Sequence, residues 1–211
     1  MRSIVRKVLI VAIFTSLVLT FLGCNGQAAN NAGRKEPTHK AAWLAYWEID
    51  AGEKDLEMTR KSLEKVSYFG AFFNENNHLF VPQELSAQKS ELKKKKVNYE
   101  TYLTFINDKQ NSDGSFVLKD KEIVRKLFAT EKSMEKHIDE IIALTLQGGY
   151  DGVEIDYEKI WKDEKIWNSF IKFTDKLYTK ALKNNLKVRI VLEPGANFSS
   201  PALIKGPEYV V

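Results

Sequence analysis

The sequence predicts an α/β domain built on a parallel β-sheet, and two observations lead to that prediction. From residue 41 to residue 211, apolar runs of strand length alternate with longer segments whose apolar residues recur at helical spacing. One expected strand, residues 150–158, lies between two such helical segments. This alternation predicts βαβ units, in which consecutive strands run parallel and helices cover the sheet.

The expected elements follow one another along the chain. The expected strands cover residues 41–48, 66–73, 99–106, 150–158, 187–193 and 207–211. Helices are expected over residues 55–63, within 82–95, from 120, from 133, and over 162–184. Asp120 and Ser133 are the expected N-caps of two helices, because their side-chain oxygens can accept hydrogen bonds from free backbone N–H groups. Gly148-Gly149 ends the helix before residue 150, and residues 74–77 and 111–115 are polar turns.

The strand over residues 150–158 carries the candidate chemistry. Side chains of a strand point alternately to opposite faces, so Glu154, Asp156 and Glu158 share one face. Carboxylates in a covered space are costly unless they have partners or a task. If the sheet closes into a barrel, we expect these acids to face its interior. Glu158 would then lie at the C-terminal mouth, where barrel sites are found. Asp151 has the opposite parity and is expected to be structural.

This stretch resembles the D-x-x-D-x-D-x-E signature of family 18 glycoside hydrolases, the chitinase-like (β/α)8 barrels. Asp151, Asp156 and Glu158 match the signature, whereas Glu154 stands where the family usually has Asp. The resemblance covers residues 41–211 and implies an incomplete (β/α)8 barrel, about the first five and a half β/α units. A complete barrel needs ~250 residues. We therefore expect a chain truncated at its C-terminus, without the family's Met-x-Tyr-Asp segment and its later Trp.

The resemblance also implies roles for the three acids. Family 18 enzymes use substrate-assisted retaining catalysis, in which the N-acetyl oxygen of the substrate is the nucleophile. Glu158 is implied as general acid and then base, and Asp156 as the group that orients the acetamide. Glu154 is implied as a deeper acid that biases the charge of Asp156. Glu154 either substitutes for the usual Asp or displaces Asp156, and both outcomes stay open.

Side chains near the ends of other expected strands are candidates for substrate binding. Tyr46 and Trp47 end the first strand, Phe72 lies in the second, and Asn107 follows the third. Aromatic faces can stack on sugar rings, although core packing explains these residues equally well. Glu193 ends the fifth strand, where a salt bridge is a simpler interpretation than a second catalytic carboxylate.

Composition and charge argue against several classes of protein. The chain has 211 residues and a mild net charge of +4, with lysine runs such as 93–96 that indicate a solvated face or a weak attraction to anionic polymers. The sequence has no aromatic–basic interleaving and no zinc spacing, so no nucleic-acid partner is expected. Neither a metal nor a cofactor is expected, because the histidines are scattered over a tether, a turn and a charged helix face. They are His39, His78 and His137.

The N-terminus resembles a bacterial lipoprotein signal. Three basic residues precede the apolar run 8–21, and Leu22-Gly23-Cys24 follows it. The resemblance implies removal of residues 1–23 and lipidation of Cys24, with residues 24–40 as a flexible tether. A plain secretory signal or an uncleaved anchor is the alternative. Each interpretation places the domain outside the cytoplasm, and lipidation would anchor it to the cell membrane.

Three functions stay open. The first is a surface-anchored hydrolase of β-1,4-linked N-acetylglucosamine polymers, either chitin-type oligomers or peptidoglycan of the cell wall. The second is a sugar-binding or scaffold relative of the same fold without turnover. The third is a non-functional truncated fragment. No feature of the sequence points to a protein partner.

Overall fold

The computed structural model describes residues 40–59, 61–86, 97–196 and 203–211. These residues belong to one unit that spans residues 39–211. The expected signal and Cys24, most of the tether, the lysine run 93–96 and most of the helical segment within 82–95 lie outside the described residues. No helix in the described part of the chain is both long enough and apolar enough to span a membrane.

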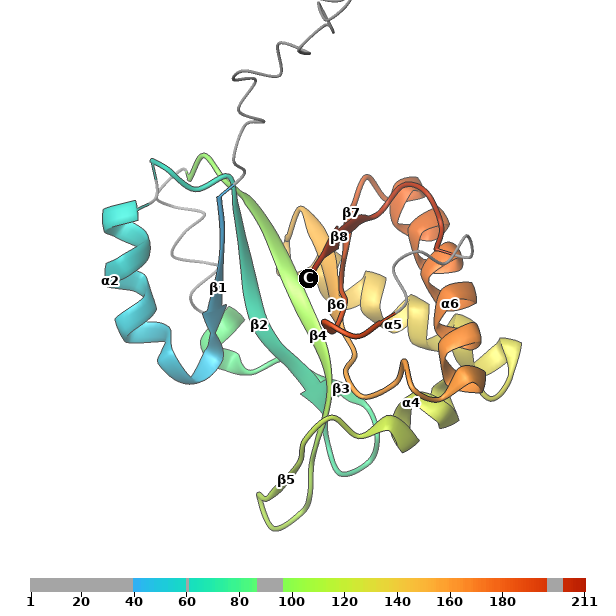
Figure 1. The fold of residues 1–211 in the computed structure, drawn as a ribbon. Coiled ribbons are helices and arrows are strands. Elements are labelled where there is room, and N and C mark those ends of the chain that lie inside the picture. Colours follow the sequence, from blue (N-terminus) through green and yellow to red (C-terminus); the bar gives the residue numbers. More distant parts are fainter. Residues whose placement is uncertain (1–39, 60, 87–96, 197–202) are drawn as a thin grey trace, which may run out of the picture. The chain divides into compact units, whose positions relative to one another are not determined.

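A parallel sheet, curled into a half-barrel, organises this unit (Figure 1). Its path follows the chain order and confirms both the predicted α/β class and the incomplete barrel. The six strands of the path are β1 (Ala41–Ala45), β2 (Lys65–Phe73), β4 (Glu100–Gln110), β6 (Gly152–Asp156), β7 (Lys187–Val191) and β8 (Glu208–Val210). All neighbours on this path pair parallel. Two short strands, β3 (Leu79–Phe80) and β5 (Phe116–Val117), pair antiparallel with β2 and β4.

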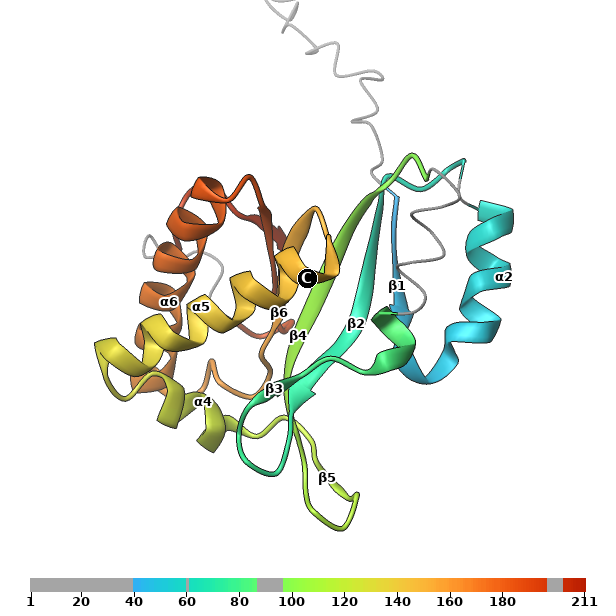
Figure 2. The same cartoon turned by 180° about the vertical axis from the view of Figure 1, so that it is seen from behind.

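The helices lie on the outer face of the curled sheet (Figure 2). They are α2 (Ile49–Thr59), α4 (Lys121–Leu127), α5 (Glu131–Gly148) and α6 (Glu164–Lys183), with a 3-10 turn, η1 (Tyr46–Glu48), before α2. The core lies between the sheet and the helices. Val153 and Ile155 of β6 are fully buried there with Ile141 of α5 and Phe173 of α6. The apolar parity of β6 therefore faces the helices, and its acidic parity faces the interior of the half-barrel.

Several boundaries differ from the sequence prediction. The first strand stops at Ala45, because the chain turns through η1 directly into α2, which begins earlier than expected. The third strand on the path extends to Gln110, because its end pairs with β5. Ser133 is not an N-cap. Thr130 caps α5, and Ser133 is the third helical residue, whose hydroxyl accepts from the Thr130 backbone in a capping box.

Local contacts fix where β6 begins. The C-cap of α5 is Gly149, whose φ of 67° lies in the left-handed region that glycine adopts readily. Asp151 then accepts hydrogen bonds from the backbone N–H and the hydroxyl of Thr101, at 2.8 and 2.7 Å, which is the expected structural role. At Gly152, a Cβ atom would lie 2.5 Å from the ring of Tyr102, so that ring requires glycine. Together these contacts set the register that turns the acids of β6 inward.

The helix layer contains a buried histidine that the sequence interpretation placed on a charged helix face. His137 of α5 is only 1% exposed, so that prediction is wrong. Its Nε2 atom lies 2.7 Å from the hydroxyl of Tyr157, and its ring stacks 5.7 Å from that of Phe173. Burial lowers the pKa of His137 to about 3. His137 occupies an inward-facing position of α5, although most of its neighbours in the sequence are charged.

Candidate active site

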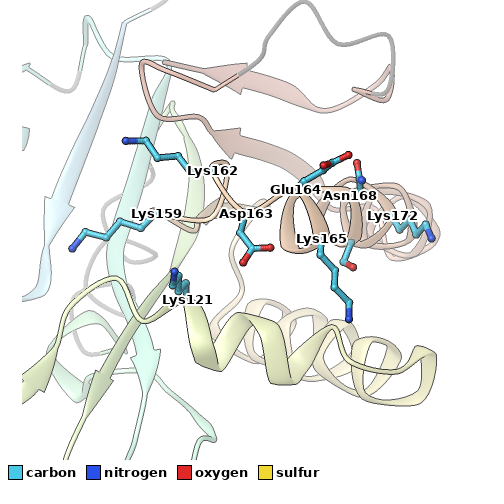
Figure 3. Close-up of a pocket in the computed structure, with 9 residues that line it drawn as sticks. Lys121, Lys159, Lys162, Asp163, Glu164, Lys165, Asn168 and Lys172 are labelled. Carbon is cyan, nitrogen blue, oxygen red and sulfur yellow. The ribbon is translucent and has the colours of Figure 1, made fainter.

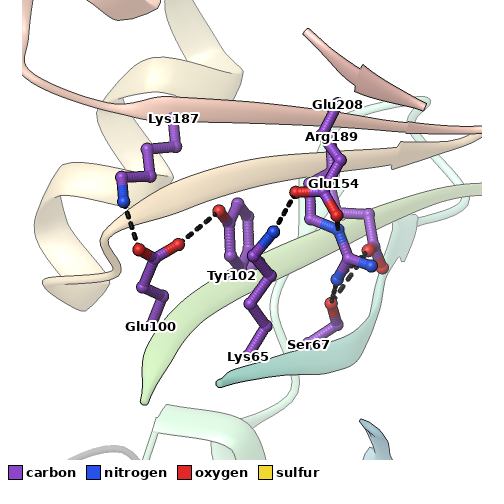
Figure 4. A network of polar contacts seen from close by, with 8 residues as sticks. All are labelled: Lys65, Ser67, Glu100, Tyr102, Glu154, Lys187, Arg189 and Glu208. Atoms are coloured by element: carbon purple, nitrogen blue, oxygen red, sulfur yellow. Dashed lines mark hydrogen bonds and ion pairs between the residues drawn. The ribbon is translucent and has the colours of Figure 1, made fainter. Parts of the chain in front are cut away.

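The inner face of the half-barrel begins with two ion pairs near the N-terminal ends of the strands (Figure 4). Lys65 of β2 pairs with Glu208 of β8, and Lys187 of β7 pairs with Glu100 of β4. The hydroxyl of Tyr102 donates a second hydrogen bond to Glu100, at 2.9 Å. Each of these two acids, at the N-terminal ends of the strands, is therefore matched by a base.

Glu154 lies in the next layer and is 0% exposed. One carboxylate oxygen accepts hydrogen bonds from Trp43 Nε1 at 2.8 Å and from Thr104 Oγ1 at 2.7 Å. The other oxygen accepts from Ser67 Oγ at 2.8 Å and lies 3.0 Å from Nη1 of Arg189. A buried charge with partners on both oxygens is compensated in the way that buried ions require. Glu154 therefore keeps its predicted place on the inner face, in the environment of a structural anion.

Arg189 reaches Glu154 from the adjacent strand, where the two residues are register partners. It is 2% exposed. Its guanidinium lies over the ring of Tyr102, 5.3 Å from the centroid, and donates to Ser67 Oγ at 3.0 Å. Its Nε atom is 3.6 Å from the carboxylate of Glu208. Arg189 thus links the Glu154 layer to the ion pairs below it.

Asp156 lies one layer closer to the C-terminal ends of the strands, opposite Ile106 of β4. Among the described residues, no side chain or backbone group donates a hydrogen bond to its carboxylate. Burial, followed by the nearby charges of Glu158 and Glu154, raises the pKa of Asp156 to about 7, against an opposing effect of Lys119. The carboxyl of Asp156 therefore titrates near neutral pH, whereas that of an ordinary aspartic acid titrates near pH ~4.

Glu158 lies just beyond the end of β6, and Asn107 fixes its backbone. The Asn107 carboxamide accepts from the Glu158 N–H at 2.9 Å and donates to the Glu158 carbonyl at 3.0 Å. Asn107 is 1% exposed. Its observed contacts position the candidate acid, and the substrate binding expected for Asn107 from the sequence stays a prediction.

A lysine that the sequence analysis did not select lies against Glu158. The ammonium of Lys119 forms an ion pair with the Glu158 carboxylate, and this hydrogen bond is the main reason that the pKa of Lys119 is raised. The Lys119 N–H donates to Asp108 Oδ1 at 2.7 Å. Burial, reinforced by the charge of Glu158, raises the pKa of Asp108 despite that hydrogen bond. We call Asp108, Lys119, Asp156 and Glu158 the mouth cluster.

The aromatic candidates differ in what they can offer a ligand. Trp47 is 59% exposed and packs edge-on against Phe69 at 5.9 Å. Tyr46 is half-buried and lies 5.0 Å from Trp47 and 5.7 Å from Phe72 between ring centroids. Phe72 is 3% exposed, and its ring also contacts Phe80. Trp47 is therefore the one of these three that presents an open ring surface, while Phe72 is part of the packed interior.

Two further sequence interpretations concern the rim and possible metals. Glu193 accepts a hydrogen bond from the backbone N–H of Lys159 at 2.7 Å. The salt bridge expected for Glu193 is not found within the described ranges. Across the same ranges, no group of three or more His, Cys, Asp or Glu side chains is arranged to hold a metal ion. Cys24 lies outside them.

The partners of Glu154 were also missed, although a signal for some of them was present. Trp43, Ser67, Thr104 and Arg189 all occupy alternate positions of their strands, so parity alone could have placed them on the inner face. Their meeting at one carboxylate depends on strand register. Lys119 left no comparable signal, because it follows the short β5 hairpin and not a strand of the main path.

The fold resembles that of several solved structures. A class V chitinase from Pseudomonas fluorescens Pf-5 superimposes with a TM-score of 0.62 and 17% identity, over 81% of this chain and 50% of that one. A mutant class V chitinase from Nicotiana tobaccum in complex with NAG4 superimposes with a TM-score of 0.59 and 15% identity, over 80% of this chain and 49% of that one. The Bacillus cereus spore cortex-lytic enzyme SleL superimposes with a TM-score of 0.55 and 16% identity, over 73% of this chain and 35% of that one.

These likenesses show that the chain has the chitinase-like barrel fold in incomplete form. The chain spans half or less of the length of each of these proteins. No protein-family model matches the sequence, and no curated protein matches it.

Proposed function

We propose that this chain carries the acid–base centre of a glycoside hydrolase that cleaves β-1,4-linked N-acetylglucosamine polymers, either chitin-type oligomers or peptidoglycan. The observation that supports this most strongly is the pairing of Asp156 and Glu158 at the mouth, with the pKa of Asp156 raised to about 7. The names of the similar structures, which include chitinases, a complex with NAG4 and a spore cortex-lytic enzyme, point to the same substrate class.

In the proposed reaction, Glu158 gives its proton to the glycosidic oxygen as the bond from that oxygen to C1 breaks. The N-acetyl carbonyl oxygen of the substrate bonds to C1 and forms an oxazolinium ion. Asp156 accepts a hydrogen bond from the acetamide N–H and balances the positive charge that develops there. Glu158 then removes a proton from the water that attacks C1, and the bond from C1 to the N-acetyl oxygen breaks, which regenerates the acetamide. The site is restored and the configuration at C1 is retained.

The Lys119–Glu158 ion pair sets a condition on this mechanism. A general acid must carry a proton, so the bound sugar has to separate Lys119 from Glu158 before the first step. Glu154 acts indirectly in this scheme, because its buried negative charge contributes to the raised pKa of Asp156.

A sugar-binding protein without turnover is the alternative, and the same ion pair favours it. If Lys119 stays on Glu158 when a glycan binds, the glycan is held but not cleaved. The third possibility, a fragment without function, is compatible with a chain that spans half or less of its structural neighbours.

The test compares the chain with its Glu158→Gln variant on N-acetylglucosamine oligomers. Glutamine keeps the shape of glutamate but cannot donate the proton, so product formation should fall by at least about 100-fold while oligomer binding persists. Glu75→Gln, which changes an exposed acid in the turn after β2, is the matched control and should leave the rate unchanged. Binding without products from the unaltered chain would favour the sugar-binding alternative. Unchanged turnover in Glu158→Gln would reject the role of Glu158.

We also propose that the chain is exported and held at the cell surface by lipid on Cys24. The support is the order of basic, apolar and Leu22-Gly23-Cys24 segments in the sequence. Metabolic labelling with a fatty-acid analogue should mark the protein in bacteria. Cys24→Ser should remove the label, and persistence of the label in that variant would contradict the assignment.

A further inference from the structure

A basic pocket lies between the start of α4 and the start of α6 (Figure 3). Its volume is about 800 Å³. Five lysines line it, together with two acids and two small polar residues. The lysines are Lys121, Lys159, Lys162, Lys165 and Lys172. These lysines come from the start of α4, from the loop before α6 and from α6 itself, and in Figure 3 Lys159 and Lys162 extend away from Lys165 and Lys172.

The charges of this pocket are not balanced by ion pairs. Within the described residues, none of its five lysines has a salt-bridge partner. Other lysines of α6 do form ion pairs. Lys176 pairs with Glu131 and Glu135, and Lys180 pairs with Asp139. These pairs show that α6 lysines find acids where the fold provides them.

The two acids of the pocket offset only part of the charge of its five lysines. Asp163 is held by Arg125 at 2.8 Å and accepts the Ile166 N–H at 3.1 Å as the N-cap of α6. Glu164 is then the one lining acid without such a partner among the described residues. Several like charges around one cavity create a positive potential that attracts anions.

The backbone holds one of these lysines in an uncommon conformation. Lys159 has a φ of 59°, in the left-handed region that side chains other than glycine adopt infrequently. Its N–H is fixed by the carboxylate of Glu193. Lys159 follows Glu158 directly in the chain, and its charge opposes the rise in the pKa of Asp108, so the pocket adjoins the mouth cluster. Figure 3 shows the side chains of Lys159 and Lys162 extending to the same side.

We propose that this basic pocket binds anionic substituents, carboxylates or phosphates, of the glycan whose sugar backbone occupies the mouth. Lysine ammonium groups bind such anions as mobile point charges, which suits substituents at variable positions. The identity of the glycan rests on the proposed function, whereas anion binding by the lysines does not. The pocket would favour an acidic wall polymer over neutral chitin.

The experiment measures the binding of three probes to the full 211-residue chain. An N-acetylglucosamine tetramer is neutral, a peptidoglycan disaccharide–peptide carries carboxylates, and a glycerol phosphate oligomer carries phosphates. The test variant is Lys159→Gln with Lys162→Gln. The matched control, Lys54→Gln with Lys183→Gln, removes the same charge from exposed sites on α2 and at the end of α6.

We expect the test variant to bind at least one anionic probe about fivefold more weakly than the unaltered chain does, since each exposed charge contact is weak. The control variant should bind that probe as the unaltered chain does, and added salt should weaken binding to the unaltered chain. The probe that responds identifies carboxylate or phosphate as the ligand. Thermal unfolding of each variant checks that the fold is intact.

Equal affinities of the test and control variants for both anionic probes would overturn the proposal, as would a failure of both probes to bind. The proposed function fails separately. Lysine-dependent binding of an anionic probe without binding of the tetramer would support the pocket and count against the glycosidase. Cleavage of the tetramer, together with unchanged anion binding in the lysine variant, would support the glycosidase and count against the pocket.

Discussion

Two regions of the same inner face differ in how many cationic partners they provide for their carboxylates. In the inner layers, three acids (Glu100, Glu154 and Glu208) are matched by three bases (Lys65, Lys187 and Arg189). In the mouth cluster, three acids share one lysine of the cluster, Lys119, whose ammonium pairs with Glu158 alone among the described residues, and Lys159 adds a weaker effect at Asp108. Glu154 and Asp156 are only two positions apart on β6, yet Glu154 has partners on both oxygens and Asp156 has none from the described residues.

This difference shows how one strand can combine stability with reactivity. A buried carboxylate with donors on both oxygens is compensated and contributes to the architecture. An unpaired carboxylate beside other acids retains a proton up to neutral pH, as acid–base chemistry requires. The inner layers therefore have the properties of a scaffold, and the mouth cluster has those of a reactive site.

The largest effect on stability is expected from breaking the inner pair. Glu154→Gln or Arg189→Gln alone leaves one buried charge without its counterion, and each should lower the free energy of unfolding by about 3–5 kcal/mol. The double variant Glu154→Gln/Arg189→Gln removes both charges and should recover part of that loss. Urea denaturation of the four proteins measures the coupling between the two residues.

The matched comparison for this cycle is Lys187→Gln with Glu100→Gln, an ion pair at the more exposed N-terminal end of the strands. Its coupling should be within about 1 kcal/mol, because solvent screens exposed pairs. If the Glu154–Arg189 coupling were no larger than this, the assignment of Glu154 as a structural anion would be wrong.

A smaller effect, dependent on pH, is expected at Asp156. Its folded pKa of about 7 lies above the ordinary value of 3.8, so the folded state binds more protons between these two pH values. Stability contributed by the protonated form is therefore lost as pH rises through this window. Between pH 5 and pH 8 the loss should be roughly 3 kcal/mol.

Asp156→Asn should remove that part of the pH dependence, because asparagine does not titrate. Urea denaturation of the parent and the variant at several pH values isolates the contribution as a difference. Parallel stability curves for the two proteins between pH 5 and pH 8 would show that the carboxyl of Asp156 titrates normally.

The smallest effect is expected at Lys119, whose side chain is 38% exposed. Lys119→Met should change stability by less than about 1 kcal/mol, because solvent screens its ion pair with Glu158. It should also raise the pKa of Asp156 further, since the Lys119 charge opposes the other effects there. The acidic limb of a pH–rate profile should therefore move to higher pH, because Asp156 acts in its ionised form in the proposed reaction. Lys126→Met on the exposed side of α4 is the control, and an equal movement there would refute the specific contact.

The sequence was sufficient for the order of the strands and for the parity of β6. Both follow from local periodicity, which residues such as Val153 and Ile155 display clearly. It was not sufficient for Arg189 as the partner of Glu154, because that contact depends on the register between β6 and β7. Lys119 was missed for a related reason. It reaches Glu158 through a hairpin whose two-residue strand β5 has too little periodicity to be recognised.

The pH titration of the Asp156 carboxyl carbon by NMR is the most direct test of the contrast between the two regions. In the unaltered chain, we predict an apparent pKa of about 7. In Glu158→Gln, the pKa of Asp156 should fall, because the charge of Glu158 is the largest contribution after burial. An Asp156 pKa close to the ordinary value of about 4, or one that does not respond to Glu158→Gln, would contradict a coupled acid pair at the mouth.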